Sequence, residues 1–525
     1  MNGRNLIGNE YAEGTTSAFK AINPLTGQTL DGEFFPAQQK DVDEALKHAV
    51  SAFTVYKNID KDRKAAFLRA IANEILALGD ALIERACAES GLPLGRIQGE
   101  RGRTVGQLNM FADLVAEGSW VDAIIDNELP DRQPAPRPDI RRMLVAMGPV
   151  VVFGASNFPL AFSVAGGDTA SALASGCPVV VKAHSAHPGT SALVASAIQK
   201  AVVSTGMPEG VFSMLFDSGY AIGEALVKHP KTKSVTFTGS YKGGMALNKI
   251  ASERAVPIPV FAEMGSINPV LLLPEALEVR AEKIAEQYAS SITMGAGQFC
   301  TNPGLLLGIA SPALTRFKET LALKVAEISS ATMLTPGIYD NYQSLSAGML
   351  EEQDVALVAK SDLAVAGATN QALATIAEVS AKVFLANPKL KEEVFGPWSL
   401  LVTADTAEEL EEVLEYAGGQ LTLSVMAEDA ELATYKSLLD KAEDITGRIL
   451  LNGVPTGVEV CAAMQHGGPF PATNDSRFTS VGTTAIRRFV RPLSWQNWSK
   501  QLLPLALQDG NPLNIWRLVD NTLTK

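Results

Sequence analysis

The chain has few of the residues that build a disulfide scaffold or a metal centre. Its 525 residues include four cysteines and five histidines. The cysteines are Cys87, Cys177, Cys300 and Cys461. None pairs with another at the spacing of a metal site, and the histidines are scattered. So few cysteines in a long chain are typical of a reducing compartment. We therefore expect no disulfide framework and no bound metal.

Clustered positive charge and long apolar runs are also missing. The formal net charge is −13, and no dense run of Lys and Arg occurs, which argues against a nucleic-acid partner. The N-terminal segment, MNGRNLIGNEYAEG, lacks the apolar core of a signal peptide. The longest uncharged stretch, 143–167, contains two Pro and four Gly, so it indicates a strand, turn and helix start rather than a membrane span. We expect a cytoplasmic protein with no membrane partner.

What the sequence does contain is a repeated alternation of apolar strands and helices. After a Pro-rich connector at 129–139, the strand-like runs are VAMGPVVVFGAS, CPVVVKAH, GVFSMLF and KSVTFTGS. A weaker alternation follows Asn268, with PVLLLPE, LLLGIA, SLLVTAD and RILLNG. Such alternation predicts an α/β fold with two doubly wound parallel-sheet domains. Ligands of these sheets bind beyond the carboxyl ends of the strands.

Two of the turns that follow strands are candidates for a dinucleotide site. VTFTGSYKGG ends a strand and opens a helix, and Gly239, Ser240 and Gly244 would let a phosphate approach the helix N-terminus. A plain tight turn would have the same residues. Lys182 ends the strand VVVK, where an ammonium can donate to ribose hydroxyls or simply lie in water.

Three further residues are candidates for chemistry. Cys300 lies in the Gly-bordered loop GAGQFCTNPG, Glu263 follows an apolar strand in VFAEMGSINP, and Asn157 lies in the turn FGASNFP. Each has a plain structural alternative: a small buried cysteine, a solvated strand end and an ordinary turn residue. No spacing rule joins the three.

Taken in order, these pieces resemble the aldehyde dehydrogenase superfamily over nearly the whole chain. The matching motifs are SNFP, VVVK, FTGS, AEMG, GQFC and EEVFGP. The resemblance implies that Cys300 attacks the aldehyde carbon and that Asn157, with the Cys300 backbone N–H, stabilises the oxyanion. It implies that Glu263 activates the water that hydrolyses the thioester. It also implies that this chemistry needs no metal.

The resemblance also assigns the cofactor residues for NADP or NAD. Lys182 and Glu393 would bind ribose hydroxyls, Phe395 would pack on the nicotinamide side and Ser240 would contact the pyrophosphate. Many NAD-preferring members have Lys-Pro-Ser-Glu where this chain has Lys-Ala-His-Ser, ending at Ser185. A hydroxyl there removes the like-charge repulsion of a 2′-phosphate and favours NADP or use of both cofactors. Tyr220 stands where related NADP-preferring members place an arginine.

Three variant motifs point to a narrower branch: GERGRTVGQL, VVKAHSAHPGT and GQFCTNPG. This branch contains bacterial α-ketoglutaric semialdehyde dehydrogenases and NADP-dependent fatty aldehyde dehydrogenases. We prefer the semialdehyde, whose distal carboxylate needs a cation or hydroxyl donors. Arg103 and Arg477 are the candidate cations, although either could equally form a surface salt bridge. Phe158 and Gln298 are further candidates for substrate contact, although Phe is usually a core residue.

Two other functions are disfavoured by the same residues. A CoA-acylating enzyme would not need Glu263 to activate water. A non-catalytic protein of this fold would not need Cys300, Asn157 and Glu263 intact.

The resemblance implies a three-part architecture. A cofactor-binding domain would comprise 1–132 and 150–262, and a catalytic domain would comprise 263–470. The segments 133–149 and 471–525 would form an oligomerisation arm. A homodimer or homotetramer is expected, and the sequence does not choose between them.

Overall fold

A seven-stranded sheet forms one half of the computed structural model, which describes residues 2–14 and 17–525. Its strand order is β2-β1-β7-β6-β5-β8-β9, in which β5 to β9 are parallel and β1 pairs antiparallel with β7. The strands are β1 (Leu6–Ile7), β2 (Glu10–Tyr11), β5 (Val150–Phe153), β6 (Val179–Lys182), β7 (Phe212–Leu215), β8 (Ser234–Thr238) and β9 (Val260–Glu263).

Helices cover both faces of this first sheet, which explains why its strands are continuous apolar runs. Val150 and Val152 pack on one face against α2 to α6, whereas Val151 packs on the other face against α1, α7 and α8. The helices are α1 (Gln39–Tyr56), α2 (Lys61–Ala77), α3 (Gly79–Ser90), α4 (Leu94–Glu117), α5 (Gly167–Ser175), α6 (Pro188–Ser204), α7 (Ala221–Lys228) and α8 (Tyr241–Ser252).

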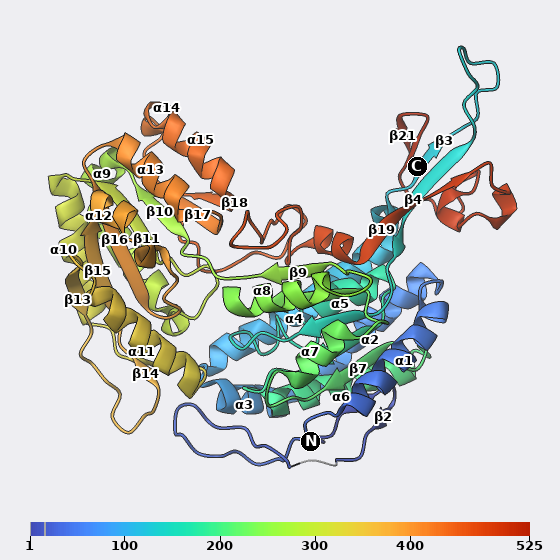
Figure 1. Ribbon diagram of the computed structural model, residues 1–525, viewed down its shortest axis with the longest axis horizontal. Helices are drawn as coiled ribbons and strands as arrows, with labels where there is room; N and C mark the ends of the chain where they lie inside the picture. The colour runs from blue at the N-terminus through green and yellow to red at the C-terminus, as the bar shows by residue number, and fades with distance from the viewer. Residues whose placement is uncertain (1, 15–16) are drawn as a thin grey trace.

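A second seven-stranded sheet forms the other half of the molecule, at the left of Figure 1. Its order is β13-β15-β16-β11-β10-β17-β18, and only the edge strand β13 is antiparallel to its neighbour. The strands are β10 (Pro269–Leu272), β11 (Leu305–Ile309), β13 (Ala356–Lys360), β15 (Thr375–Ser380), β16 (Trp398–Ala404), β17 (Gln420–Met426) and β18 (Thr446–Leu451). A separate pair is β12 (Ala331–Thr332) with β14 (Gln371–Ala372).

Helices again lie on both faces of the second sheet. Helices α9 and α10 pack on one face, and α11, α12, α13 and α15 pack on the other. The helices are α9 (Pro274–Thr293), α10 (Pro312–Ala326), α11 (Pro336–Leu350), α12 (Ala381–Ala386), α13 (Ala407–Ala417), α14 (Glu431–Thr434) and α15 (Lys436–Ile445). Two helix-covered, mainly parallel sheets confirm the predicted α/β class.

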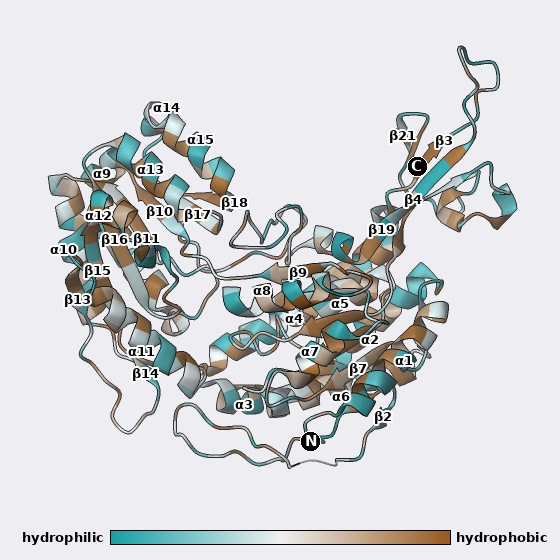
Figure 2. Cartoon of the chain, viewed as in Figure 1, coloured by the Kyte–Doolittle hydropathy of each residue, from teal (hydrophilic) through white to brown (hydrophobic). Residues whose placement is uncertain are grey.

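A third sheet forms an arm that projects from the body (Figure 1). Its order is β19-β4-β3-β20-β21. The strands are β3 (Ile124–Asp126), β4 (Ile140–Ala146), β19 (Val490–Gln496), β20 (Arg517–Val519) and β21 (Thr522–Thr524). The ribbon of β3 and β4 carries both apolar and polar residues (Figure 2).

The observed arm differs in its bounds from the expected segments 133–149 and 471–525. The rest of the expected division into domains stays a prediction. The first strand of the arm begins at Ile124, before the expected start of the arm at residue 133. Part of the expected tail segment lies instead against the first half: Thr473 forms a β-bridge with Glu263, and Arg488 makes a 2.8 Å ion pair with Asp168 of α5. Among the described helices, none is long and apolar enough to cross a bilayer.

Candidate active site

The loop that carries Cys300 is shaped by a run of left-handed backbone. Gly295, Ala296 and Gly297 have φ angles of 57°, 58° and 65°. This conformation is costly for residues with a side chain and cheap for glycine. A Cβ on Gly297 would also lie 2.2 Å from the carbonyl group of Gly396. The GAG sequence therefore lets the chain turn sharply after α9 and present Cys300 between the two halves.

A buried asparagine holds this loop to the second sheet. Asn268 lies on the segment 264–268 that leads from β9 to β10. Its Nδ2 donates to the carbonyl oxygens of Cys300 (2.9 Å) and Asn302 (2.8 Å), and its Oδ1 accepts from Thr422 Oγ1 (2.9 Å). Since each amide atom is paired in a solvent-free environment, the position of the nucleophile is tied to the sheet.

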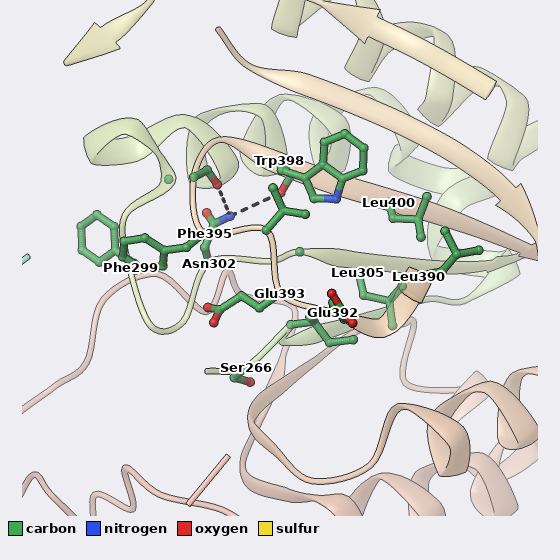
Figure 3. A pocket seen from close by; sticks show the side chains of 15 residues that line it. Ser266, Phe299, Asn302, Leu305, Leu390, Glu392, Glu393, Phe395, Trp398 and Leu400 are labelled. Atoms are coloured by element: carbon green, nitrogen blue, oxygen red, sulfur yellow. Dashed lines mark hydrogen bonds between the residues drawn. The ribbon is translucent and has the colours of Figure 1, made fainter. Parts of the chain in front are cut away.

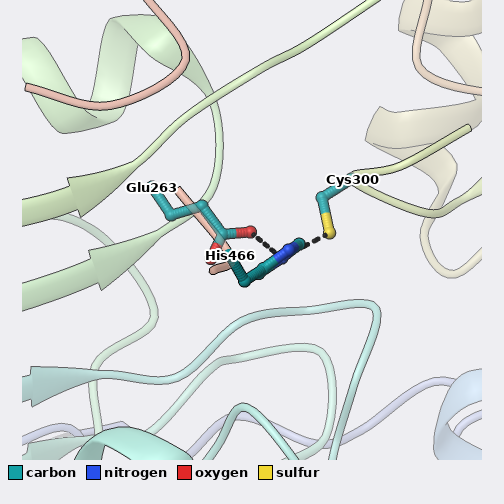
Figure 4. Close-up of side chains that lie close together, drawn as sticks. All are labelled: Glu263, Cys300 and His466. Atoms are coloured by element: carbon teal, nitrogen blue, oxygen red, sulfur yellow. Dashed lines mark hydrogen bonds and ion pairs between the residues drawn. The ribbon is translucent and has the colours of Figure 1, made fainter. Parts of the chain in front are cut away.

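His466 lies between the sulfur of Cys300 and the carboxylate of Glu263, and the three side chains come from distant segments of the chain (Figure 4). The Sγ atom lies 3.4 Å from Nε2 of His466, and the same nitrogen lies 3.0 Å from Oε1 of Glu263. Ser480 Oγ donates to Oε2 of Glu263 at 2.5 Å. His466, Ser480 and Glu263 are all buried. The imidazole can thus exchange a proton with either the thiol or the carboxylate.

The charges of this cluster oppose ionisation of the thiol. Burial, and then the neighbouring Glu263 carboxylate, raise the pKa of Cys300 well above its ordinary value, and the Arg103 charge offsets this only in part. Burial also acts to raise the pKa of Glu263, but His466, Ser480 and Cys300 together hold that pKa below its ordinary value. At neutral pH the resting site therefore contains a carboxylate and a protonated thiol, which needs a proton acceptor before it can attack.

The same three groups form a possible metal-ligand set. Each of Glu263, Cys300 and His466 offers one ligand atom, and these atoms lie within 4.8 Å of one another. Thiolate, imidazole and carboxylate are ligands that Zn²⁺ accepts. A zinc ion bound there would occupy the lone pair of the Cys300 sulfur. Zinc at this position would therefore prevent attack by Cys300 on a substrate.

Asn157 lies close to the nucleophile loop. It follows β5, and its Nδ2 donates to the backbone carbonyl of Gln298 at 3.1 Å. The amide is therefore held two residues from Cys300, at a position from which it can donate to an oxyanion that forms on the substrate. Its expected role as an oxyanion donor, together with the N–H of Cys300, stays a prediction.

Gln298 itself contradicts its expected contact with substrate. Its side chain is buried, with Oε1 accepting from Leu334 N (3.0 Å) and Nε2 donating to Gly295 O (3.1 Å). Both ends are thus used to hold the loop. Gln298 supports the shape of the site, because its side chain has no free polar atom to offer a ligand.

The expected substrate contact of Arg477 stays a prediction, and its position gives it no support. Its side chain is 79% exposed and pairs with Asp475 at 2.5 Å on the same surface loop. Phe158 and Arg103, in contrast, lie beside the site. The Phe158 ring packs 5.6 Å from that of Phe299, and the Arg103 guanidinium lies 5.1 Å from the ring centroid of Phe162.

The expected cofactor residues lie at the carboxyl ends of the first sheet and across from it. Lys182 ends β6 half-buried, and in the described chain its ammonium has no hydrogen bond or ion pair. Burial lowers the pKa of Lys182, and the Asp217 carboxylate offsets this only in part. An ammonium that no described residue pairs, at the carboxyl end of a parallel strand, is free to donate to the hydroxyls of a ligand.

The helix α8 offers an open N-terminus for a phosphate. Gly239 and Ser240 are exposed, Gly244 is buried against Met264, and Ser240 Oγ accepts from the N–H of Gly243 at 3.2 Å. Free N–H groups at an exposed helix start are donors for an anion. Ser185 is exposed in the turn before α6, and the Tyr220 side chain is 87% exposed.

Glu393 and Phe395 line a small hollow on the second half (Figure 3). Asn302 borders it and donates to the carbonyls of Gly396 (3.2 Å) and Trp398 (3.4 Å). Burial raises the pKa of Glu393 to about 7, against a hydrogen bond from the Ser266 backbone. A half-buried carboxyl group beside this hollow can accept hydrogen bonds from ribose hydroxyls, so the set of polar groups as a whole fits a dinucleotide.

The sequence analysis missed three residues that shape this site: His466, Ser480 and Asn268. His466 begins the loop HGGPFPATNDSRFTS, which had drawn interest only for Arg477. A histidine before two glycines is a signal that could have been noticed. Ser480 and Asn268 carry no such signal, because their importance depends on contacts with residues far along the chain.

The sequence and fold were compared with known proteins. The sequence profile of the aldehyde dehydrogenase family matches residues 11–468. The chain is 53% identical over 523 residues to an alpha-ketoglutaric semialdehyde dehydrogenase 2 of Azospirillum brasilense, covering 99% of both chains. It is 46% identical over 525 residues to an alpha-ketoglutaric semialdehyde dehydrogenase of Acinetobacter baylyi, covering 100% of this chain and 99% of the relative.

Solved structures show the same fold at much lower identity. A betaine aldehyde dehydrogenase of Staphylococcus aureus in complex with NAD⁺ aligns with a TM-score of 0.80 and 19% identity, over 94% of this chain and 95% of that one. The apo form of a G234S mutant of that enzyme aligns with a TM-score of 0.81. The profile match and the full-length relatives agree with the site geometry: this chain belongs to the aldehyde dehydrogenase family.

Proposed function

We propose that the chain oxidises 2,5-dioxopentanoate (α-ketoglutaric semialdehyde) to 2-oxoglutarate with NADP or NAD, with NADP preferred. The observation that carries the reaction type is the contact of Cys300 Sγ with the His466–Glu263 pair, next to the Asn157 amide. The substrate is supported by two relatives that carry this activity in their names and match this chain end to end at 53% and 46% identity.

Each residue of the site has a separate role in the proposed reaction. The Cys300 thiol gives its proton to the His466–Glu263 pair: Nε2 of His466 takes it while its own proton moves to Glu263, and the pair releases this proton before hydrolysis. The thiolate attacks the aldehyde carbon, and Asn157 Nδ2 with the Cys300 N–H stabilises the resulting oxyanion. NADP or NAD, when bound, would supply the acceptor for the hydride of this carbon. Glu263 then removes a proton from the water that hydrolyses the Cys300 thioester, with Ser480 holding the far oxygen of the carboxylate in place.

The cofactor would lie across the two halves. Lys182 and Glu393 would bind ribose hydroxyls, and Ser240 with the N-terminus of α8 would bind the pyrophosphate. Phe395 would pack beside the nicotinamide. Support comes from the ammonium of Lys182, which no described residue pairs, and from the half-buried carboxyl group of Glu393, whose pKa burial raises to about 7.

Initial rates with 2,5-dioxopentanoate and a series of linear aldehydes test the substrate. We expect kcat/KM for the oxo-acid to exceed that of every neutral aldehyde by tenfold or more, about 1.4 kcal/mol of transition-state preference. Formation of NADPH and NADH in the same assay gives the cofactor ratio. If addition of CoA yields acyl-CoA instead of the free acid, CoA and not water accepts the acyl group from the Cys300 thioester.

A fatty aldehyde is the second candidate substrate. The wall of the site contains an apolar cluster of Ala155, Phe158, Ala161, Phe162, Phe299 and Val481. If kcat/KM instead rises with chain length, by about 1 kcal/mol for each buried methylene, this second candidate replaces the semialdehyde.

Ser185 provides a separate test of the cofactor preference. We expect Ser185→Glu to raise KM for NADP on the order of 10- to 100-fold, because a carboxylate would repel the 2′-phosphate. KM for NAD should change little. The neutral variant Ser185→Gln is the matched control for size. Equal effects of both variants on NADP would mean that bulk, not charge, matters at this exposed position.

We also propose that the arm is an oligomer contact of a homodimer or homotetramer. Supporting this, large apolar side chains are exposed on the arm and its C-terminal extension: Trp498, Leu502, Leu505, Trp516 and Leu523. Exposed apolar groups in this number are typical of protein–protein contacts. The expectation of a homodimer or homotetramer comes from the resemblance to the family, and the number of subunits stays a prediction.

A further inference from the structure

Two arginines of α4 reach the wall of the active site. Arg96 and Arg103 are seven residues apart, which places them on the same side of the helix, about 10 Å along its axis. The Arg96 guanidinium lies 4.4 Å from the ring centroid of Phe158 and 4.6 Å from that of Phe299. Arg103 lies 5.9 Å from the Phe158 centroid and 5.1 Å from that of Phe162.

These rings connect the arginines to the catalytic residues. Phe158 follows Asn157 in the chain, and Phe299 precedes Cys300. The Arg103 charge is close enough to Cys300 to act on the pKa of its thiol, lowering it against burial and Glu263. Stacking on aromatic faces also orients each guanidinium plane. A substrate bound to Cys300 would therefore have a cationic wall within its reach.

Within α4, the charge of the two arginines is only half balanced. Glu100 lies between the arginines on α4, but its Oε1 already accepts from the N–H groups of Leu160 (2.8 Å) and Ala161 (3.0 Å). Its Oε2 lies 3.5 Å from Arg96 Nη2. Arg103 forms no ion pair with any described residue. Two positive charges and one negative charge leave an excess of one positive charge.

The hydrogen-bond donors of the arginines are also unused. Nε and Nη2 of Arg103 and Nη2 of Arg96 are buried without a hydrogen-bond partner among the described residues. A third arginine near the site, Arg448, differs in that its Nη2 donates to the carbonyl of Pro455 at 3.0 Å. Buried guanidinium donors without acceptors are costly, and a planar carboxylate is the ligand that satisfies a guanidinium at two donors at once.

We infer that Arg103, with Arg96 beside it, binds the distal carboxylate of the substrate and so selects oxo-acid semialdehydes over neutral aldehydes of the same length. This inference rests on the proposed function. The single excess positive charge matches one carboxylate. The Glu100 carboxylate pairs with Arg96, so the wall contains one unpaired guanidinium instead of two.

The experiment compares two aldehydes of equal chain length, 5-oxopentanoate and pentanal, in the wild type and in Arg103→Met. Methionine keeps an unbranched side chain on the Phe162 ring and removes the charge. We expect kcat/KM for 5-oxopentanoate to fall about 10- to 100-fold, chiefly through KM, with pentanal little changed. Arg96→Met should act in the same direction. The matched control is Arg101→Met, which removes an arginine of the same helix that donates to Gly79 O.

A second readout separates binding from folding. Because two donor atoms of Arg103 are buried without a hydrogen-bond partner among the described residues, its replacement by methionine should leave the melting temperature unchanged or raised. In the wild type, 2-oxoglutarate should slow alkylation of Cys300 by iodoacetamide, and in Arg103→Met this protection should be lost. If the wild type prefers pentanal, the proposed substrate class fails. If it prefers 5-oxopentanoate and Arg103→Met retains that preference, only the arginine site is overturned.

Discussion

Replacement of Cys300 by serine is expected to abolish aldehyde oxidation while the protein stays folded and able to bind its cofactor. A serine hydroxyl is a much weaker nucleophile than a thiol at neutral pH, and loss of a nucleophile that acts in a coupled set costs about 10⁴-fold or more in kcat/KM. The side chains are nearly equal in size, so the loop held by Asn268 should be unchanged. Initial rates and cofactor binding by fluorescence measure the two properties separately.

Cys461→Ser is the matched control, because Cys461 is an exposed thiol. This variant should retain wild-type rates and should leave Cys300 as the main site of alkylation by iodoacetamide. Oxidation by Cys300→Ser at a rate near that of the wild type would overturn the assignment of the nucleophile. Loss of activity in Cys461→Ser alone would move that assignment to the other thiol.

Replacement of His466 by glutamine should lower kcat/KM by about 10²- to 10³-fold, the size of a general acid–base contribution. Glutamine can still form hydrogen bonds near Glu263 and Cys300, but it cannot accept the thiol proton. Burial and the Glu263 carboxylate raise the pKa of Cys300, so without the imidazole a thiolate forms only at higher pH. The rising limb of the pH–rate profile should therefore move to more alkaline pH in the variant.

The rate of Cys300 alkylation as a function of pH measures this effect directly. It should be recorded in the Cys461→Ser background, where the exposed thiol is absent. His48→Gln is a suitable control, since His48 contacts Glu44 and Glu209 on the surface of the first half. If His466→Gln leaves both the alkylation profile and kcat/KM unchanged, Glu263 takes the thiol proton without the imidazole.

Local pattern was enough to predict the two sheets. The valine-rich runs at β5 and β6 are buried on both faces, and this requires apolar residues at every position, which is visible without a structure. The glycines before Cys300 and at the start of α8 were likewise visible, because left-handed turns and helix starts demand particular residue types. The order of six short motifs then indicated the family, which the profile match over 11–468 confirms.

The substrate residues were less predictable. Arg103 and Arg477 looked alike in the sequence, as arginines that could meet a carboxylate. In the structure Arg477 pairs with Asp475 in solvent, whereas Arg103 lies against Phe162 and has no ion pair among the residues that the structure describes. Whether an arginine is paired depends on which segments fold around it, and this information is not local.

The sequence by itself determined the fold class, the nucleophile loop and the identity of the residues that could react. Only the tertiary structure decided which of them act together. His466 meets Glu263 across 203 positions of the chain and Cys300 across 166. The physical reason is that helix and strand periodicity depend on near neighbours, whereas a proton relay depends on distances of about 3 Å between side chains that only the packing of the two sheets brings together.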